Sequence, residues 1–161
     1  NFLVSVTKIK ILLSRYFIGI AAQITLLFVL YSVMLSVIGI NNALVIAFLC
    51  AILNIIPYIG PLISIVLMSV LTMTGYIDTS LINEMLSKVV YIFIGFSVVQ
   101  LIDNFIIQPY IFSKSVKSHP LEVFIVIISS GMLFGIVGLI IAIPLYTAVK
   151  VIYLSYSGKE A

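Results

Sequence analysis

The stretch at residues 43–74 reads ALVIAFLCAILNIIPYIGPLISIVLMSVLTMT. It contains no charged residue, but its centre holds Pro57 and Pro61 with Gly60 between them. Proline removes a backbone donor and clashes with the preceding helical turn, so one continuous helix is not expected here. Its halves, residues 43–56 and 62–74, would each rise roughly 20 Å against a membrane core of about 30 Å. The stretch therefore predicts a broken or re-entrant hairpin of two short helices.

The composition of the chain points to a membrane environment. Of its 161 residues, 63% are hydrophobic and 8% are charged, whereas a soluble domain is about 45–50% apolar and about 25% charged. The lipid bilayer is thus the expected surrounding. The eight basic residues are too few and too scattered to follow a nucleic-acid backbone, so no nucleic-acid partner is expected. A single cysteine, Cys50, can build neither a disulfide framework nor a thiolate metal site, and we expect it to serve packing.

Other apolar segments flank this hairpin. Residues 16–40 carry no charge and residues 89–107 carry only Asp103; each is close to the length of about 20 residues that a helical span needs. Residues 120–149 would measure roughly 45 Å as one straight helix, and their glycines and Pro144 predict a bend or break near the middle. We expect an amphipathic interfacial segment at residues 1–15, a transmembrane domain at 16–150 and a cytoplasmic tail at 151–161. The fold class is then an all-α membrane bundle with two full spans and two broken or re-entrant hydrophobic hairpins.

The distribution of charge favours this hairpin arrangement. Lys and Arg collect in cytoplasmic loops close to membrane helices. If both broken stretches return to the side they left, the basic head, the loop with Lys114 and Lys117 and the C-terminal tail share one side. The loop with Asp78 and Glu84 then faces the other side. If residues 43–74 crossed the membrane once, the basic loop would lie opposite the head. We therefore predict a cytoplasmic head, basic loop and C-terminus.

The order of span and broken segment occurs twice, which indicates an internal structural repeat. Interruptions at corresponding positions are where transporters bind cargo, because unwound backbone exposes carbonyls and helix ends. The alternative is a pair of kinked helices that serve packing only.

Asp103 is the one acidic residue inside the two predicted full spans, residues 16–40 and 89–107. A carboxylate in the middle of a membrane helix costs about 2.5–3.5 kcal/mol on insertion scales, so a specific role is expected. Ser97, Gln100 and Asn104 follow one another at three- and four-residue spacing beside it, which predicts one polar helix face pointing into the bundle. Gln108 and Pro109 close this span, since the residue before proline avoids helix. The alternative is that Asp103 reaches the basic loop and pairs with a lysine there.

At the first break, Asn54 lies one turn before Pro57. Its amide could bond the backbone groups that the proline frees. Asn54 and Tyr58 could equally present an amide and a hydroxyl to a solute. Both interpretations remain open from the sequence.

The second break holds the pattern Gly131-x-x-x-Gly135, extended by Gly138. By itself this pattern indicates close helix packing. His119 is expected to be an interfacial or capping residue. The sequence offers no nucleophile with a paired base, no phosphate loop and no metal-ligand cluster, so we expect no enzymatic activity, no cofactor and no metal.

Together these segments resemble the AI-2E (PerM-like) transporter family. The resemblance rests on NIIPYIGP at residues 54–61, DNFIIQP at 103–109, HPL at 119–121, and FGIVG at 134–138 followed by Ala142 and Pro144. It implies a multi-pass permease of the bacterial cytoplasmic membrane, of which this chain would be the C-terminal half. Some relatives export the quorum-sensing signal autoinducer-2, and others exchange sodium or lithium for protons.

The resemblance and the residues give a combined expectation. We predict an exporter of a small polar solute such as autoinducer-2, working as a homo-oligomer. The alternatives are a sodium (lithium)/proton antiporter, which would need the ionisable Asp103 and a monovalent cation as partner, and a membrane scaffold that transports nothing. The predicted substrate-binding residues are Asn54, Pro57, Tyr58, Gly60, Pro61, Gln100, Asp103, Asn104, Gln108, Pro109, Gly131, Gly135 and Gly138.

Overall fold

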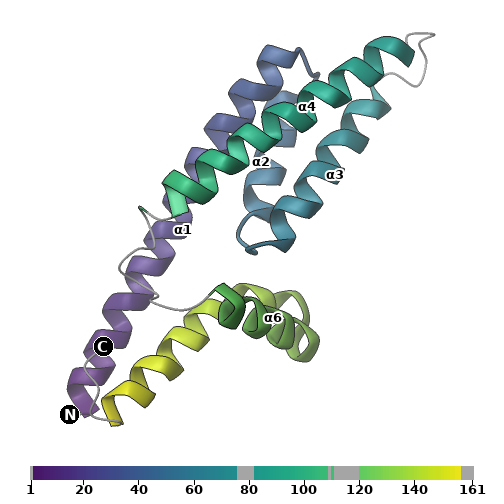
Figure 1. Cartoon of the computed structure of the whole chain (residues 1–161). Helices are drawn as coiled ribbons and strands as arrows, with labels where there is room; N and C mark the ends of the chain where they lie inside the picture. The colour runs from purple at the N-terminus through teal and green to yellow at the C-terminus, as the bar shows by residue number, and fades with distance from the viewer. Residues whose placement is uncertain (1, 76–81, 109, 111–119, 157–161) are drawn as a thin grey trace. The chain divides into compact units, whose positions relative to one another are not determined.

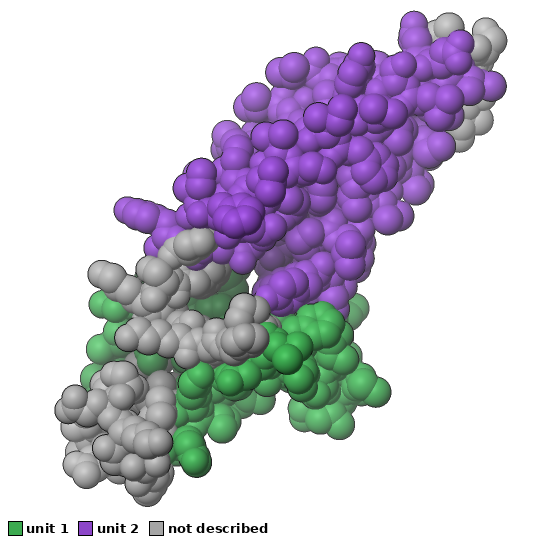
Figure 2. Space-filling model, in the orientation of Figure 1, with its two compact units in different colours: residues 1–20, 111–161 green, residues 21–110 purple. Residues whose placement is uncertain are grey.

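The computed structural model describes residues 2–75, 82–108, 110 and 120–156. Every regular element within these ranges is a helix (Figure 1), which confirms the predicted all-α class. The chain divides into two compact units: unit 1 comprises residues 1–20 and 111–161, and unit 2 comprises residues 21–110 (Figure 2). Each unit is described by itself below.

The first helix, α1, runs over Phe2–Ile38 without interruption. The interfacial segment and the first span, which the sequence analysis separated at residue 15, thus belong to one helix. It ends at Gly39, whose φ of 75° is left-handed. Lys88 of a later helix donates from Nζ to the Gly39 carbonyl at 2.8 Å, and a cation is stabilising at a helix C-terminus.

Residues 43–74 form two antiparallel helices, α2 (Ala43–Leu53) and α3 (Ile59–Thr74). The predicted interruption of residues 43–74 is therefore confirmed. Small side chains let the two helices approach each other closely. The Cys50 Sγ donates to the Ser64 carbonyl at 3.6 Å, and the Ser64 Oγ donates to the Cys50 carbonyl at 3.0 Å. These reciprocal bonds join the middle of α2 to the first turns of α3.

The next helix, α4, covers Ile82–Ile102 and continues into η1, a π-helix at Asp103–Ile107. The helix begins before the predicted start of the span at residue 89, because residues 83–88 are compatible with helix and Glu84 lies in its first turn. An acidic side chain there is favoured by the helix dipole. The π-helix ends at Ile107, and Gln108 keeps helical backbone angles (φ −61°, ψ −49°).

The core of unit 2 lies where α1, α2, α3 and α4 meet. Tyr31 of α1 and Phe96 of α4 stack with parallel rings whose centroids are 5.7 Å apart. Fully buried side chains surround this pair, among them Leu27, Leu35, Ala47, Cys50, Ala51, Met68 and Ile92. The surfaces turned away from this core are also apolar. They include Leu62 and Val37, which are 68% and 82% exposed, as expected of side chains in contact with lipid.

Helix α6 in unit 1 covers Pro120–Tyr156, but it doubles back at Gly135 (φ 61°, ψ −143°), as Figure 1 shows. The predicted break in residues 120–149 is therefore confirmed and lies at this glycine. Its two legs are joined near their ends, because the Tyr146 hydroxyl donates to the Glu122 carboxylate. Lys150 Nζ lies 3.5 Å from the same carboxylate. Pro144 lies inside the second leg.

Among the residues that the structure describes, three helical stretches are long and apolar enough to cross a membrane: Lys10–Ile38, Ile82–Ile107 and Leu121–Lys150. The third contains the Gly135 break. The helices α2 and α3 are shorter apolar helices. How these segments cross the bilayer stays a prediction.

Candidate functional site

The tip of the α2–α3 hairpin has a backbone that few sequences can adopt. Tyr58 has φ 66° and ψ −48°, and the Ile59 amide donates to the Pro57 carbonyl at 2.8 Å. This is a γ-turn with positive φ, which is rare and strained for a residue with a side chain. A Cβ at Gly60 would lie 2.1 Å from the Leu53 carbonyl oxygen. The turn therefore requires glycine at position 60, and strain of this kind is typical of functional segments.

Asn54 connects this tip to the neighbouring helices. Its Nδ2 donates to the Cys50 carbonyl at 2.7 Å and approaches the Ser64 Oγ at 3.3 Å. Its Oδ1 accepts from Gln100 Nε2 at 3.3 Å, and the same Nε2 donates to the Tyr31 hydroxyl oxygen at 2.9 Å. We call Tyr31, Asn54, Ser64 and Gln100 the hairpin-tip cluster. It joins side chains from α1, α3 and α4 to the residue at which α2 ends.

Asp103 forms a second polar cluster, three residues after Gln100. Its side chain is 0% exposed. Gln23 of α1 donates from Nε2 to both carboxylate oxygens, at 3.0 and 3.1 Å. Gln108 donates from Nε2 to Oδ2 at 2.7 Å and to the Asn104 Oδ1 at 3.1 Å. We call Gln23, Asp103, Asn104 and Gln108 the Asp103 cluster.

The π-helix explains how Asp103 and Gln108 meet. The Gln108 backbone N–H donates to the Asp103 carbonyl, five residues earlier. This wider turn brings the side chain of Gln108 back onto the Asp103 carboxylate. Insertions of this kind occur frequently at functional sites. Pro109, the last residue of the predicted polar cluster, lies outside the described residues.

The electrostatics of Asp103 are unusual for a buried carboxylate. All its hydrogen bonds to described residues are ones that it accepts from neutral amides. No described Lys or Arg forms an ion pair with it. Lys114 and Lys117, the predicted alternative partners, lie outside the described residues. A buried carboxylate held only by neutral amides is a site at which a proton or a monovalent cation could supply the missing positive charge.

The structure brings together part of the predicted site. Asn54, Gln100, Asp103 and Gln108 all lie in the two clusters, and Gly60 shapes the hairpin tip. Tyr58 is 47% exposed, and Pro57 and Pro61 are half-buried beside it. Gly131, Gly135 and Gly138 belong to unit 1. In that unit a Cβ at Gly138 would lie 2.0 Å from the Ser130 carbonyl oxygen. The backbone at Gly138 is therefore close to the Ser130 carbonyl.

The predicted polar face of α4 needs a correction. Ser97 and Asn104 are exposed in the described part of the chain, and the Ser97 hydroxyl donates to the Phe93 carbonyl of its own helix. The buried row instead consists of Ile92, Phe96, Val99, Asp103 and Ile107. The prediction inferred the buried face of α4 from the positions of the amide side chains. The apolar residues at four- and three-residue spacing before Asp103 identify that face correctly.

Sequence reasoning missed Gln23, Tyr31 and Ser64. All three are buried, with exposures of 7%, 0% and 0%. One signal could have found the first two, since Gln23, Leu27, Tyr31 and Leu35 follow one another at four-residue spacing along the first span. Polar groups in a row of buried apolar residues indicate a shared partner.

Comparison with known proteins agrees with the resemblance seen in the motifs. The model of the family described as "AI-2E family transporter" matches residues 2–158. The "Putative transport protein YueF" of Bacillus subtilis (strain 168) is 31% identical over 73% of this chain and 29% of its own length. The "Putative transport protein YrrI" of the same strain is 30% identical over 74% of this chain and 31% of its own length.

The matches to the curated relatives are partial. The aligned region spans about a third or less of each curated relative. No solved structure matches the chain. Because the family model covers nearly every residue, the family resemblance is confirmed, and the chain belongs to the AI-2E family of transporters.

Proposed function

We propose that this chain is part of a transporter in the bacterial cytoplasmic membrane that exports a small polar solute such as autoinducer-2. The observation that supports this best is Asp103, a carboxylate with 0% exposure inside the apolar stretch Ile82–Ile107. Burying it costs about 2.5–3.5 kcal/mol on insertion scales. The amide donors of Gln23 and Gln108 offset part of that cost, and the Gln23 bond forms only where α1 and η1 stay together. A carboxylate that is buried at this free-energy cost is expected to have a functional role.

The hairpin tip supplies the second part of the proposed route. Gln100 Nε2 is shared between Tyr31 and Asn54, at 2.9 and 3.3 Å. A solute hydroxyl could replace either of these bonds with little loss, because a neutral hydrogen bond contributes only about 0.5–1.5 kcal/mol net. The unwound residues between α2 and α3 would then meet the solute, as broken helices do in other transporters.

Sodium (lithium)/proton antiport is the second candidate, and the charge balance of the Asp103 cluster favours it. Its carboxylate accepts bonds from neutral amides, and no described basic residue forms an ion pair with it. A proton or a small cation could bind there in turn, with the Gln23 and Gln108 amides rotating to offer their oxygens. Solute export does not need an ionisable group at position 103, so the two candidates differ in a testable way.

The test uses the full-length protein in proteoliposomes, with labelled autoinducer-2 and, separately, a sodium gradient read by a pH dye. We expect Asp103→Asn to insert and assemble normally, because it keeps the size of the side chain. If Asp103 couples transport to protons or sodium, this variant should lose gradient-driven flux, whereas solute export that runs on the amides should persist. Ser97→Ala is the matched control, since this exposed hydroxyl bonds only its own helix, and it should leave flux unchanged. Normal pH-dependent flux in Asp103→Asn would rule out coupling through Asp103. Absence of both fluxes in the unmodified protein would favour the scaffold alternative.

A further inference from the structure

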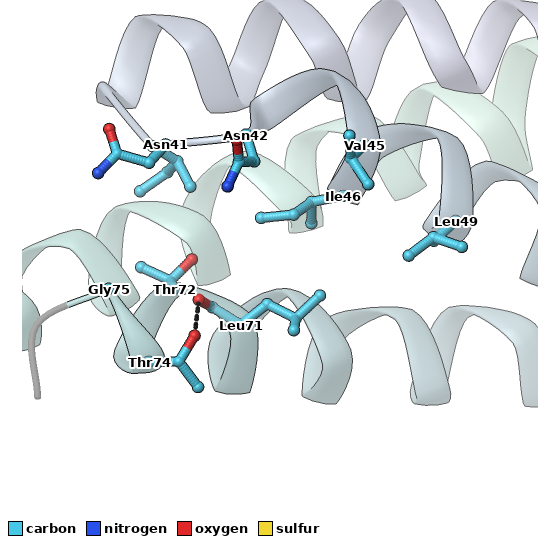
Figure 3. A pocket seen from close by; sticks show the side chains of 10 residues that line it. Asn41, Asn42, Val45, Ile46, Leu49, Leu71, Thr72, Thr74 and Gly75 are labelled. Carbon is cyan, nitrogen blue, oxygen red and sulfur yellow. Dashed lines mark hydrogen bonds between the residues drawn. The ribbon is translucent and has the colours of Figure 1, made fainter.

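A pocket lies at the end of unit 2 that is remote from the Asp103 cluster. It has a volume of about 310 Å³ and forms where α1 ends, α2 begins and α3 ends (Figure 3). That volume is at the lower end of the range for small-molecule sites, about 300–1,000 Å³. Gln23, which holds Asp103, lies fifteen positions before Ile38 at the end of α1, about 22 Å along a helix axis. The pocket is therefore separate from both polar clusters.

The lining of the pocket is free of charge. None of the described residues that line it is acidic or basic. Ile46, Leu49 and Leu71 provide an apolar wall, while Asn41 and Asn42 lie on the side across from α3 (Figure 3). Asn42 begins α2 in a left-handed conformation, and its side chain makes no capping hydrogen bond. Its amide is thus not used by the helix that it starts. Such a lining suits an uncharged molecule with both an apolar part and polar oxygens.

Thr72 supplies an independent sign that this pocket receives a polar group. Its side chain is 2% exposed, and no described residue gives its hydroxyl a hydrogen-bond partner. A threonine inside a helix usually bonds the carbonyl four residues earlier, as Thr147 does at 2.8 Å. Leaving a buried hydroxyl unsatisfied is unfavourable. Figure 3 shows Thr72 on the side of α3 that faces Asn42. A ligand hydroxyl in the pocket would satisfy it.

We propose that this pocket binds a small uncharged solute that carries at least one hydroxyl and a short apolar part, and that it is a terminal subsite of the transport route. The role in the route rests on the proposed transport function, whereas binding does not. The Thr72 hydroxyl bonds the solute at the base of the pocket, the Asn41 and Asn42 amides bond its remaining oxygens, and the Ile46 and Leu71 side chains cover its apolar part.

The experiment measures protection of a thiol at the rim of the pocket. Full-length protein in proteoliposomes carries Cys50→Ala and Val45→Cys, because Val45 lines the pocket, is 61% exposed and is not needed for binding. Its labelling by a maleimide is followed with increasing 1,2-hexanediol. Hexanoate serves as the charged comparison of equal chain length. We expect the diol to slow labelling and hexanoate to have no effect. Thr72→Val, which keeps the shape of the side chain, should require about three- to tenfold more diol for equal protection, the effect of losing one neutral hydrogen bond.

Thr74→Val is the matched control for this variant. Thr74 also lines the pocket, but its hydroxyl already donates to the Leu71 carbonyl at 2.7 Å, so diol protection should stay unchanged. Thermal unfolding checks that Thr72→Val is folded. It should be at least as stable as its parent, because an unsatisfied buried hydroxyl is removed.

Two results would overturn the binding site: no protection by the diol, or protection that is equal in the parent and in Thr72→Val. Solute flux measured on the same vesicles separates this outcome from failure of the transport function. Normal flux without diol protection rejects the pocket alone. Diol protection with no solute flux in any variant supports the binding site and rejects its place in a transport route.

Discussion

At the scale of single residues, the pairing of Gln23 with Asp103 is the contact that the protein can least easily lose. Removing one partner of a buried polar pair leaves the other unsatisfied, whereas replacing both with apolar groups can be nearly neutral. The two residues lie 80 positions apart in the chain and are joined by two hydrogen bonds. The stability of the contact between α1 and η1 should therefore depend on both residues together.

We predict that Gln23→Leu lowers the stability of the full-length protein in detergent by about 1–3 kcal/mol, because it leaves the carboxylate with one amide partner fewer. The double variant Gln23→Leu with Asp103→Leu should lose less than the single one. Thermal unfolding followed by circular dichroism measures both. Thr25→Ala is the control, since the exposed Thr25 hydroxyl bonds only the Ala21 carbonyl of its own helix. A double variant less stable than Gln23→Leu would contradict this account.

The sequence identified Asp103 but not its partner, for a physical reason. The spacing of residues within one helix shows which side chains share a face. The cost of burying a carboxylate indicates that another helix covers that face. Neither tells which helix lies opposite. The π-helix at Asp103–Ile107 also could not be predicted, because it shifts the register of Gln108 relative to a regular helix. Asn54 was identified because proline chemistry is local to its own segment.

At the scale of elements, both hairpins depend on a glycine, but in different ways. Gly60 is required for space, since a Cβ there would lie 2.1 Å from the Leu53 carbonyl oxygen. Gly135 is required for its backbone angles, φ 61° and ψ −143°, while a Cβ there would meet nothing within 4 Å. In the sequence, prolines and glycines predicted both helix interruptions. Which glycine would carry the second reversal was not predictable, because Gly131, Gly135 and Gly138 are equally suitable by type.

We predict that Gly135→Ala weakens the reversal in α6 by about 1–3 kcal/mol, because alanine is strained at these angles. Spin labels at Leu121 and Val149 in a Cys50→Ala background measure the distance between the two legs. The unmodified hairpin should give a short distance, since Glu122 and Lys150 lie within 3.5 Å, and Gly135→Ala should add a population near the straight-helix value of about 42 Å. Ile136→Ala, an exposed neighbour, is the control. A separation near 42 Å in the unmodified protein would contradict the hairpin.

At the scale of the whole molecule, the contacts within unit 2 support the topology that the charges predict. Lys88, near the start of α4, reaches the Gly39 carbonyl at the end of α1. Gln23 of α1 meets Asp103 at the other end of α4. These two contacts make α1 and α4 antiparallel. The pocket residues Asn42 and Gly75 lie together, so the α2–α3 hairpin returns to the end from which it left. The Asp103 end of α4 therefore lies beside the Gln23 end of the part of α1 in unit 2.

Cysteine labelling tests on which side of the membrane the loops of the chain lie. In full-length protein with Cys50→Ala, a cysteine at Asn83 should react with a membrane-impermeant maleimide in intact cells, and a cysteine at Ser115 should react only after the cells are opened. The reason is that Lys114 and Lys117, like Lys10 and Arg15, are predicted to lie in the cytoplasm, and α4 is predicted to cross the bilayer once between residue 83 and the basic loop. A single cysteine at Lys159 serves as the control for the cytoplasmic side and should behave as Ser115→Cys does. Labelling of residues 83 and 115 from the same face would mean that α4 does not cross the bilayer. Labelling of residue 115 from outside and residue 83 from inside would reverse the orientation but keep the hairpin, because the α2–α3 return depends on the contacts of unit 2 and not on the sign of the charges.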